Sequence, residues 1–435
     1  MKLPEIQEYL ADFQTKPIPK LVPRMLKVPT TPKIISIIGP RRAGKSYYLY
    51  QVMKELLSQG VKKEQLVYLN FEDTRLTGIT FNEIREILKL HWQFYPSSIS
   101  QKLYLFMDEP QNIARWEAAA RSLHDEGYKM FISGSSSKLL SKEIATSLRG
   151  RTLSYLLLPF SFQEFVQSKS PLLLTAPLGS QQKSMLLSLL EEHLAFGGYP
   201  EVFQTSDIET KLKIINEYFN LIIYRDLIER YNIRNTKLLK WLIKSILATF
   251  SKELSIHKIY STALTQGFKI SKNTLYSYFS LLEDSFFVFS LPKFSSSIRK
   301  GDNALSKSYL CDLGFAKLIE TSADKGRKLE NTVFLELKRR QGPLTELCYW
   351  KNYPQQEEVD FVVKEGSVQQ LIQVCANLDD PDTKKREVRA LLKASEELCC
   401  NSLLVITECL EAEEAIGNKH IIYVPLWKWL LGSKL

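Results

Sequence analysis

Gly39-Pro40-Arg41-Arg42-Ala43-Gly44-Lys45-Ser46 is an octapeptide that matches the P-loop pattern G-x-x-x-x-G-K-[ST] at every fixed position. The apolar run Ile34–Ile38 precedes it and the amphipathic stretch Tyr47–Leu57 follows it. In a strand–loop–helix unit of this kind, glycines let backbone N–H groups close around a phosphate, and the helix N-terminus adds a favourable field. The context argues against a chance glycine-rich turn, and it predicts a site for a nucleoside triphosphate.

The residues of this loop have distinct expected roles. The Lys45 ammonium is expected to reach the β- and γ-phosphates of ATP, and the Ser46 hydroxyl is expected to hold Mg²⁺. The nucleotide-binding residues predicted here are Gly39, Pro40, Arg41, Arg42, Ala43, Gly44, Lys45, Ser46 and Tyr47.

Two adjacent acids, Asp108 and Glu109, follow the apolar run Leu103–Met107. Ligands of open parallel sheets bind at the carboxyl ends of the strands, so these acids are expected beside the P-loop. Asp108 is predicted to bind Mg²⁺ directly or through water, and Glu109 is predicted to orient and polarise the attacking water. A kinase of this fold does not need the second acid, whereas an ATPase that hydrolyses does. The pair therefore predicts ATP hydrolysis.

Further polar candidates follow the next predicted strand. Ser133 is the first choice for a residue that contacts the γ-phosphate or the water, and Ser135 is the second. An ordinary serine-rich turn remains the alternative for each. Arg149 or Arg151 is a candidate arginine finger, which would stabilise transition-state charge on the nucleotide of a neighbouring subunit. A plain surface arginine remains the alternative, and a finger would require a homo-oligomer.

Short apolar runs alternate with helical stretches from Pro32 to about Phe162. This alternation predicts a mainly parallel sheet covered on both faces by helices. The expected strands are Ile34–Ile38, Leu66–Phe71, Leu103–Met107, Met130–Ser133 and Leu153–Leu158.

Several motifs together resemble the prokaryotic AAA+-type ATPases related to the archaeal ATPase clade. The resemblance rests on GPRRAGKS, LYLFMDEPQNIARW, FISGSSSKLL, LRGR and LPFSFQEF, and it continues through FGGYPEVF, LIIYRDLIERY, YLCDLGF, KLENTVFLEL and EEVDFVV. It implies that Lys45, Ser46, Asp108 and Glu109 are the Walker residues. It also implies a C-terminal winged helix followed by a restriction-endonuclease-like region.

The expected fold class is α/β, with five segments along the chain. These are an N-terminal segment (1–31), a P-loop ATPase domain with a parallel sheet (32–162), a helical lid or linker (163–235), a winged-helix-like module (236–305) and an endonuclease-like α/β domain (306–435).

The expected winged-helix-like module contains the amphipathic stretch Ser271–Glu283, with Ser271 as N-cap. Lys272, Asn273, Tyr276 and Tyr278 lie off the centre of its apolar stripe. Two interpretations of the module remain open. It either binds double-stranded DNA through this helix and its wing, or serves only to pack against the rest of the chain.

The C-terminal segment departs from the endonuclease pattern that it resembles. Glu330 on a helix and Asp360 on a strand match the first two acidic positions. Gln373 then stands where an acid is usual, and Cys375 stands where a lysine is expected. Gln373 is expected to ligate a metal only weakly, and a hydrolytic water is not expected to be activated without the lysine. We therefore predict a nuclease-shaped domain that has little or no cleavage activity and binds DNA or a protein partner.

Composition bears on the partners of the protein and on its cellular compartment. The formal net charge is +10, with 58 basic and 48 acidic residues, which fits a phosphate or nucleic-acid partner without requiring one. The six cysteines show no metal-binding spacing, and unpaired thiols indicate a reducing compartment. No apolar run approaches the ~20 residues of a spanning helix, so a cytoplasmic protein without membrane contact is expected.

The first functional hypothesis is a Mg²⁺-dependent ATPase that acts as a nucleotide-driven switch or motor on DNA or a protein partner. The second hypothesis is an ATP-regulated DNA-binding protein with incidental turnover. The third hypothesis, an ATP-gated nuclease, requires Gln373 and Cys375 to be tolerated in the cleavage centre.

Overall fold

The computed structural model describes residues 3–135, 148, 150–175, 178–295, 305–319 and 325–432. Contacts divide the chain into two compact units, described one at a time below. The first comprises residues 1–158 with 284–286, and the second comprises residues 159–283 with 287–435. Each of the six cysteines is a free thiol.

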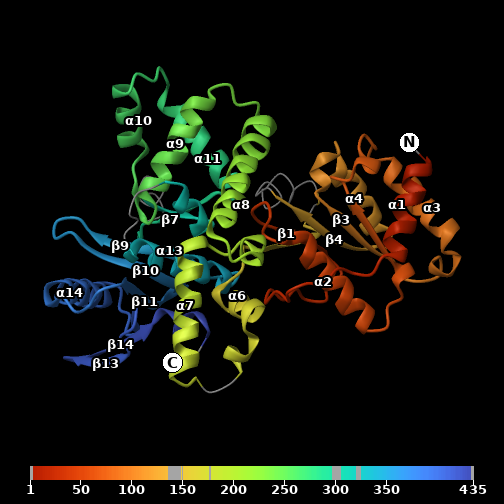
Figure 1. Ribbon diagram of the computed structural model, residues 1–435. Helices are drawn as coiled ribbons and strands as arrows, with labels where there is room; N and C mark the ends of the chain where they lie inside the picture. Colours follow the sequence, from red (N-terminus) through yellow and green to blue (C-terminus); the bar gives the residue numbers. More distant parts are fainter. Residues whose placement is uncertain are drawn as a thin grey trace. The chain divides into compact units, whose positions relative to one another are not determined.

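The first unit, drawn in red to orange in Figure 1, is built on a five-stranded parallel sheet with the strand order β2-β3-β4-β1-β5. All five predicted strands are confirmed, with end points that differ from the expected ones by no more than two residues. They are β1 (Ile34–Ile38), β2 (Leu66–Asn70), β3 (Tyr104–Asp108), β4 (Lys129–Gly134) and β5 (Thr152–Leu156).

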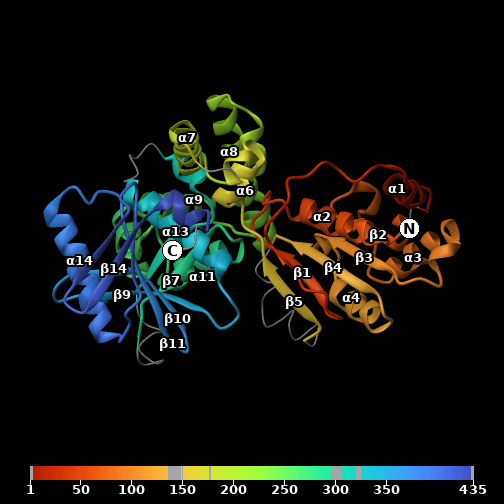
Figure 2. The ribbon, with the colours of Figure 1, turned by 90° about the horizontal axis from the view of Figure 1, so that it is seen from below.

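Helices cover both faces of this sheet. Figure 2 shows α2 (Lys45–Ser58) on one face and α4 (Trp116–Asp125) on the other, as right-handed crossovers in opposite directions require. The unit also contains α1 (Leu3–Thr15) and α3 (Glu83–Phe94). The core under α2 joins side chains of the helix to alternate residues of the strands: Ile35, Ile37, Tyr48, Leu49, Val52, Met53, Leu66, Tyr68, Phe106, Phe131 and Leu157.

The second unit begins with helices. They are α6 (Phe162–Lys169), α7 (Ser180–Phe196), α8 (Ile208–Leu221) and the π-helical stretch η8 (Ile222–Glu229) that continues α8. Ser161 and Glu164 form a reciprocal capping box at the start of α6. On α8 and η8, Ile215, Ile222 and Ile223 are buried and form the apolar face of the helix.

A small antiparallel sheet follows among three helices. Its strands are β6 (Lys252–Leu254), β7 (Val288–Pro292) and β8 (Ser306–Leu310), in the order β6-β8-β7. The helices are α9 (Thr236–Thr249), α10 (Ile256–Thr265) and α11 (Lys272–Asp284), and Ser271 accepts the N-cap hydrogen bond of Thr274.

One expectation for this region differs from the structure. A single strand, β7, lies between residues 285 and 295, and its partner is β8. Since β6 and β7 both pair with β8, the small sheet crosses the expected segment boundary between 305 and 306. Local apolar patterning marks a strand but does not show which distant strand pairs with it.

A six-stranded mixed sheet completes the second unit, in the order β13-β14-β12-β11-β10-β9. The strands are β9 (Glu346–Asn352), β10 (Glu357–Glu365), β11 (Ser367–Cys375), β12 (Leu403–Thr407), β13 (Ala412–Ile416) and β14 (Lys419–Pro425). The helices are α13 (Lys325–Arg340), α14 (Pro381–Glu397) and α15 (Leu426–Leu430). The register between β9 and β10 shifts between Val359 and Val362, which places Asp360 at a bulge.

Candidate nucleotide site

The P-loop connects β1 to α2 at the carboxyl edge of the first sheet. Gly39 has φ 153°, and a Cβ atom there would lie 2.1 Å from the Leu157 carbonyl oxygen. Gly44 has φ 95°, in the left-handed region that favours glycine. A side chain would clash with Leu157 at position 39 and would strain the backbone at position 44. Local geometry therefore explains both fixed glycines of the motif.

Lys45 is the first residue of α2 and is buried. Its ammonium donates hydrogen bonds to the carbonyl oxygens of Gly39 at 3.1 Å and Pro40 at 3.0 Å. It also lies 3.6 Å from the Glu109 carboxylate. The lysine is thus folded over its own loop, within reach of the acid that follows β3.

Asp108 ends β3 opposite Ser133 of β4 in the parallel register. Its carboxylate accepts hydrogen bonds from the Ser133 hydroxyl and, at 2.7 Å, from the Tyr68 hydroxyl. A further hydrogen bond links it to the Ser46 side chain. Burial raises the pKa of Asp108, and the neighbouring Glu109 charge raises it further.

The Ser46–Asp108 pair fits the magnesium ion that a P-loop site implies. Hard divalent cations prefer oxygen ligands, and the hydroxyl and the carboxylate already meet here. A buried carboxylate whose pKa is raised also gains from an added cation, because the cation offsets both the desolvation and the repulsion from Glu109.

Glu109 occupies a left-handed turn, with φ 52°, directly after β3. Its carboxylate accepts hydrogen bonds from the Ser135 N–H at 3.3 Å, from the Ser135 hydroxyl at 3.0 Å, and from the Gln111 amide. Burial acts to raise the pKa of Glu109, but the charges of Lys45 and Arg41 outweigh it and the net pKa lies below the usual value. Glu109 is therefore a fixed, ionised acid.

The remaining loop residues lie in more varied surroundings. Arg41 forms an ion pair with Glu72 at 2.9 Å, and Arg42 adopts a left-handed φ of 65°. Tyr47 is 53% exposed, and its ring meets Tyr50 edge-on. The structure thus brings Lys45, Ser46, Asp108, Glu109, Ser133 and Ser135 together and leaves Tyr47 turned toward solvent.

Arg24 is a contributor that sequence reasoning missed. Its guanidinium is buried and donates to the carbonyl oxygens of Ala43, at 2.7 Å, and Leu158, at 2.6 Å. It thereby fastens the P-loop to the chain that follows β5. Tyr68 and Gln111 were missed as well; they contact Asp108 and Glu109 through hydrogen bonds that a single sequence does not reveal.

Arg149 and Arg151 are the two candidates for an arginine finger. Arg149 lies outside the described residues. Arg151 precedes β5, so it lies at the amino edge of the sheet, whereas the P-loop lies at the carboxyl edge. Its guanidinium pairs with Asp125 at 2.7 and 3.1 Å. Arg151 therefore cannot reach the nucleotide site of its own subunit in this conformation.

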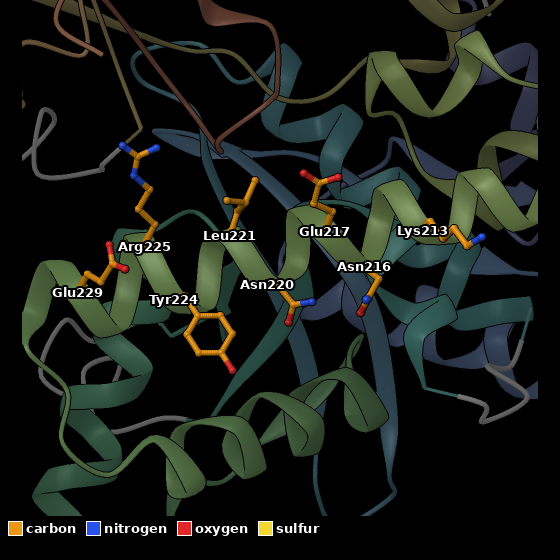
Figure 3. A pocket seen from close by; sticks show the side chains of 8 residues that line it. All are labelled: Lys213, Asn216, Glu217, Asn220, Leu221, Tyr224, Arg225 and Glu229. Carbon is orange, nitrogen blue, oxygen red and sulfur yellow. The ribbon is translucent and has the colours of Figure 1, made fainter. Parts of the chain in front are cut away.

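A shallow open groove follows one side of α8 and η8 in the second unit (Figure 3). Tyr224 borders it, and its hydroxyl accepts a hydrogen bond from Lys240 of α9 at 2.6 Å. The lining residues are polar for the most part: Lys213, Asn216, Glu217, Asn220, Leu221, Tyr224, Arg225 and Glu229. The groove carries none of the residues expected to bind nucleotide.

The acids expected for an endonuclease-like centre also come together within the second unit. Glu330 of α13 and Asp360 of β10 both contact the ammonium of Lys307, a residue of β8 that the sequence analysis did not single out. Among the described residues, no group of three or more His, Cys, Asp and Glu side chains is arranged to hold a metal ion.

The parallel sheet, the P-loop and the paired acids define a P-loop NTPase of the AAA type. The model of the AAA domain family matches residues 31–166, and two domains of unknown function, DUF8612 and DUF4143, match residues 187–325 and 325–429. The chain is 38% identical to uncharacterized protein MJ1544 of Methanocaldococcus jannaschii over 95% of its own length and 91% of that protein. It belongs to the same family.

Another relative is an uncharacterized protein of Haemophilus influenzae, with 27% identity over 91% of this chain and 93% of that protein. Among solved structures, the Aeropyrum pernix ORC1 protein in complex with DNA is 13% identical, with a TM-score of 0.29 over 73% of this chain and 90% of that one. Cdc6p from Pyrobaculum aerophilum is 12% identical, with a TM-score of 0.26 over 65% and 85%. TM-scores this low do not establish a shared overall arrangement.

None of the helices within the described ranges combines the length and the apolar character needed to cross a bilayer.

Proposed function

We propose that this chain binds ATP with Mg²⁺ and hydrolyses it. The observation that carries the proposal is the position of the Glu109 carboxylate, 3.6 Å from the Lys45 ammonium and held by Ser135 and Gln111. An acid fixed this close to the phosphate-binding lysine, on a strand end beside a second acid, is arranged for hydrolysis rather than for binding alone.

Lys45 and the loop backbone bind the phosphates. The ammonium donates to the Gly39 and Pro40 carbonyl oxygens and pairs with Glu109. Phosphate oxygens are stronger acceptors than carbonyl oxygens, because they carry charge. We infer that Lys45 exchanges these contacts for the β- and γ-phosphates while the amides of the loop close around them.

Ser46 and Asp108 would hold the magnesium ion, which when bound neutralises charge on the β- and γ-phosphate oxygens. Tyr68 and Ser133 orient Asp108 from the neighbouring strands. Glu109 accepts a hydrogen bond from the attacking water and orients it toward the γ-phosphate. Ser135 fixes the rotamer of Glu109, and Ser133 is the residue that we assign nearest to the reacting phosphate.

Phosphate release from ATP tests the proposal. Wild-type protein is expected to release phosphate in the presence of Mg²⁺, and Glu109→Gln is expected to lower kcat by about 10²- to 10⁴-fold while retaining ATP. Glu126→Gln is the matched control, since Glu126 forms an exposed ion pair with Arg85 in the same unit. Wild-type turnover in the Glu109→Gln protein would show that the role given to this acid is wrong.

The same proposal assigns the segments of the chain. Residues 32–162 form the ATPase domain after the N-terminal segment 1–31, 163–235 form a helical lid, 236–305 form a winged-helix-like module, and 306–435 form an endonuclease-like domain. Support for the winged helix comes from the order α9-β6-α10-α11-β7 within residues 236–305, and from the antiparallel sheet that β6 and β7 complete with β8 of the next segment.

Nucleotide state would act as a switch or motor on DNA or a protein partner, in the reducing interior of the cell. An arginine finger from this segment, Arg149 or Arg151, would have to serve a neighbouring copy, because Arg151 lies at the opposite edge of the sheet from its own P-loop. We therefore propose a homo-oligomer, and sizing the protein with and without ATP tests it.

An ATP-regulated DNA-binding protein is the second candidate function. It is favoured by the exposed side chains of Asn273 and Tyr276 on α11, the helix that a winged helix presents to a DNA groove. Double-stranded DNA is expected to be retained with steep salt dependence, and Asn273→Ala with Tyr276→Ala is expected to weaken retention. Unchanged retention in that variant, or none at low salt, would remove this candidate.

A further inference from the structure

Lys307 is a buried lysine in the middle of a carboxylate cluster. It lies on β8 and is 2% exposed. Its Nζ atom is 2.8 Å from Glu330 Oε1, 2.6 Å from Glu358 Oε1 and 2.8 Å from Asp360 Oδ1. Three carboxylate oxygens from α13 and β10 therefore converge on one ammonium group.

Two of these acids are the metal ligands that the resemblance to endonucleases implies. Glu330 stands on the helix and Asp360 at the bulge of the strand, so a divalent cation would lie where their oxygens meet. The ammonium already occupies that position. Oxygens at 2.6–2.8 Å suit an ammonium donor, whereas Mg²⁺ demands oxygens at about 2.0–2.1 Å.

The third expected ligand is also engaged elsewhere. The side-chain oxygen of Gln373 accepts a hydrogen bond from the Asp360 N–H at 3.2 Å, and its amide donates to Glu387 at 2.5 Å. Cys375, which stands where a catalytic lysine is expected, donates to the Asn377 carbonyl oxygen at 3.3 Å. The residues present therefore do not fit a divalent-cation centre.

Electrostatics keep the lysine in place. Burial alone would lower the pKa of Lys307, but the charges of Asp360, Glu330, Tyr309 and Glu358 outweigh it and raise the pKa well above the usual value. The surrounding acids therefore favour the charged form of the ammonium. A divalent cation would have to enter beside this charge or expel it from three charge-assisted hydrogen bonds.

We propose that Lys307 is an internal counter-ion that takes the place of the divalent cation in the endonuclease-like domain and makes that domain metal-independent. The lysine also fastens the small sheet to the larger one. Its strand neighbour Tyr309 donates to Glu330 at 2.6 Å and stacks on Phe334 with centroids 4.1 Å apart. Lys351 joins Glu358 to Glu253 of β6 at 2.8 and 3.1 Å.

This arrangement accounts for a nuclease-shaped domain without a cleavage centre. The acids compensate the charge of the buried lysine, since removing one partner of a buried ion pair leaves an uncompensated charge. It also gives the cluster a latent property. Without the amine, three acidic side chains would face one another with no compensating charge, and closing their oxygens around a divalent cation would offset that repulsion.

Mn²⁺ binding to the full-length, nucleotide-free protein tests the proposal, with Asp108→Asn in every sample so that the P-loop site does not contribute. The parent protein is expected to show no saturable Mn²⁺ signal by electron paramagnetic resonance and no change in Tm with Mn²⁺. Lys307→Met is expected to lower Tm by about 5–15 °C and to regain most of that loss on adding Mn²⁺. Lys351→Met is the matched control, since it removes a cation from Glu358 but leaves Lys307 in the centre.

Four outcomes decide the matter. Mn²⁺ binding in Lys307→Met but not in Lys351→Met supports the proposal. A folded Lys307→Met protein that gains no Mn²⁺ affinity contradicts it. Saturable Mn²⁺ binding by the parent protein that disappears in Asp360→Asn also contradicts the proposal. If Lys307→Met does not fold, Mn²⁺ binding to the parent protein is the measurement that decides. In that case, absence of such binding in the parent supports it.

Discussion

The Lys45 ammonium lies 3.6 Å from the Glu109 carboxylate at the carboxyl edge of the parallel sheet. The contact joins the lysine that we propose to bind phosphate to the acid that we propose to orient the attacking water. It also explains why Glu109 is ionised although it is buried, because Lys45 and Arg41 lower its pKa against the effect of desolvation. Replacing either residue should therefore change the electrostatic environment of the other.

Replacing Lys45 by alanine should weaken ATP binding by about 100-fold or more, since a charge-assisted contact to the phosphates is lost together with the charge that offsets Glu109. Titration with a fluorescent ATP analogue measures the effect. Lys54→Ala on the same helix is the control, because Lys54 is exposed and should leave affinity unchanged. Equal affinities in the two variants would contradict the role given to Lys45.

The two serines after Ile132 should separate binding from turnover. Ser135 donates to Glu109, so Ser135→Ala is expected to lower kcat by about 3- to 10-fold with little change in ATP affinity. Ser133 donates to Asp108, so Ser133→Ala is expected to raise the Mg²⁺ concentration needed for half-maximal activity. Steady-state kinetics at varied Mg²⁺ measure both effects. Identical kinetic profiles for the two variants would show that the serines do not have separate partners.

Arg24 should stabilise the P-loop without touching nucleotide. Arg24→Met leaves the buried carbonyl oxygens of Ala43 and Leu158 without their donors, which should cost about 1–3 kcal/mol of unfolding free energy. It should also weaken ATP binding, because the loop loses its anchor. Chemical denaturation and nucleotide titration measure the two effects. Arg85→Met, which removes an exposed ion pair to Glu126, should change stability by less than about 1 kcal/mol.

His193 should make the stability of the second unit depend on pH. Burial against Phe162 and Phe165 lowers its pKa to about 4, from 6.5. The unfolded chain then binds more protons than the folded chain between these values, so stability rises with pH through this window and is lost as pH falls from 6.5 toward 4. The contribution amounts to about 3 kcal/mol at most.

Thermal unfolding of wild-type protein and His193→Gln between pH 4 and pH 7 measures this effect. The variant is expected to show a shallower loss of Tm on acidification. Parallel pH profiles for the two proteins would mean that His193 is not responsible.

Sequence was sufficient wherever a function depends on a local pattern. The strand Ile34–Ile38, the P-loop and the acids Asp108 and Glu109 are each recognisable within a few neighbouring residues, and the structure places them at one edge of a parallel sheet. The apolar face of α8 was predictable for the same reason, because its period shows in consecutive residues.

Sequence was insufficient where partners are far apart in the chain. Arg24 meets Leu158 across 134 positions, and Lys307 meets Asp360 across 53 positions. A single sequence does not reveal such long-range pairings. Nothing in Ser306-Lys307-Ser308 itself therefore indicates that the lysine is buried among acids. The expected boundary between residues 305 and 306 likewise separates β8 from β6 and β7, because the pairing of these strands is set by tertiary contacts.

Isothermal calorimetry of ATP with Mg²⁺ on the folded wild-type protein tests the central claim most directly. The account predicts saturable heat from a single class of site, which disappears in Lys45→Ala. Absence of any heat of ATP binding by wild-type protein that is folded by circular dichroism, with Mg²⁺ present, would contradict it.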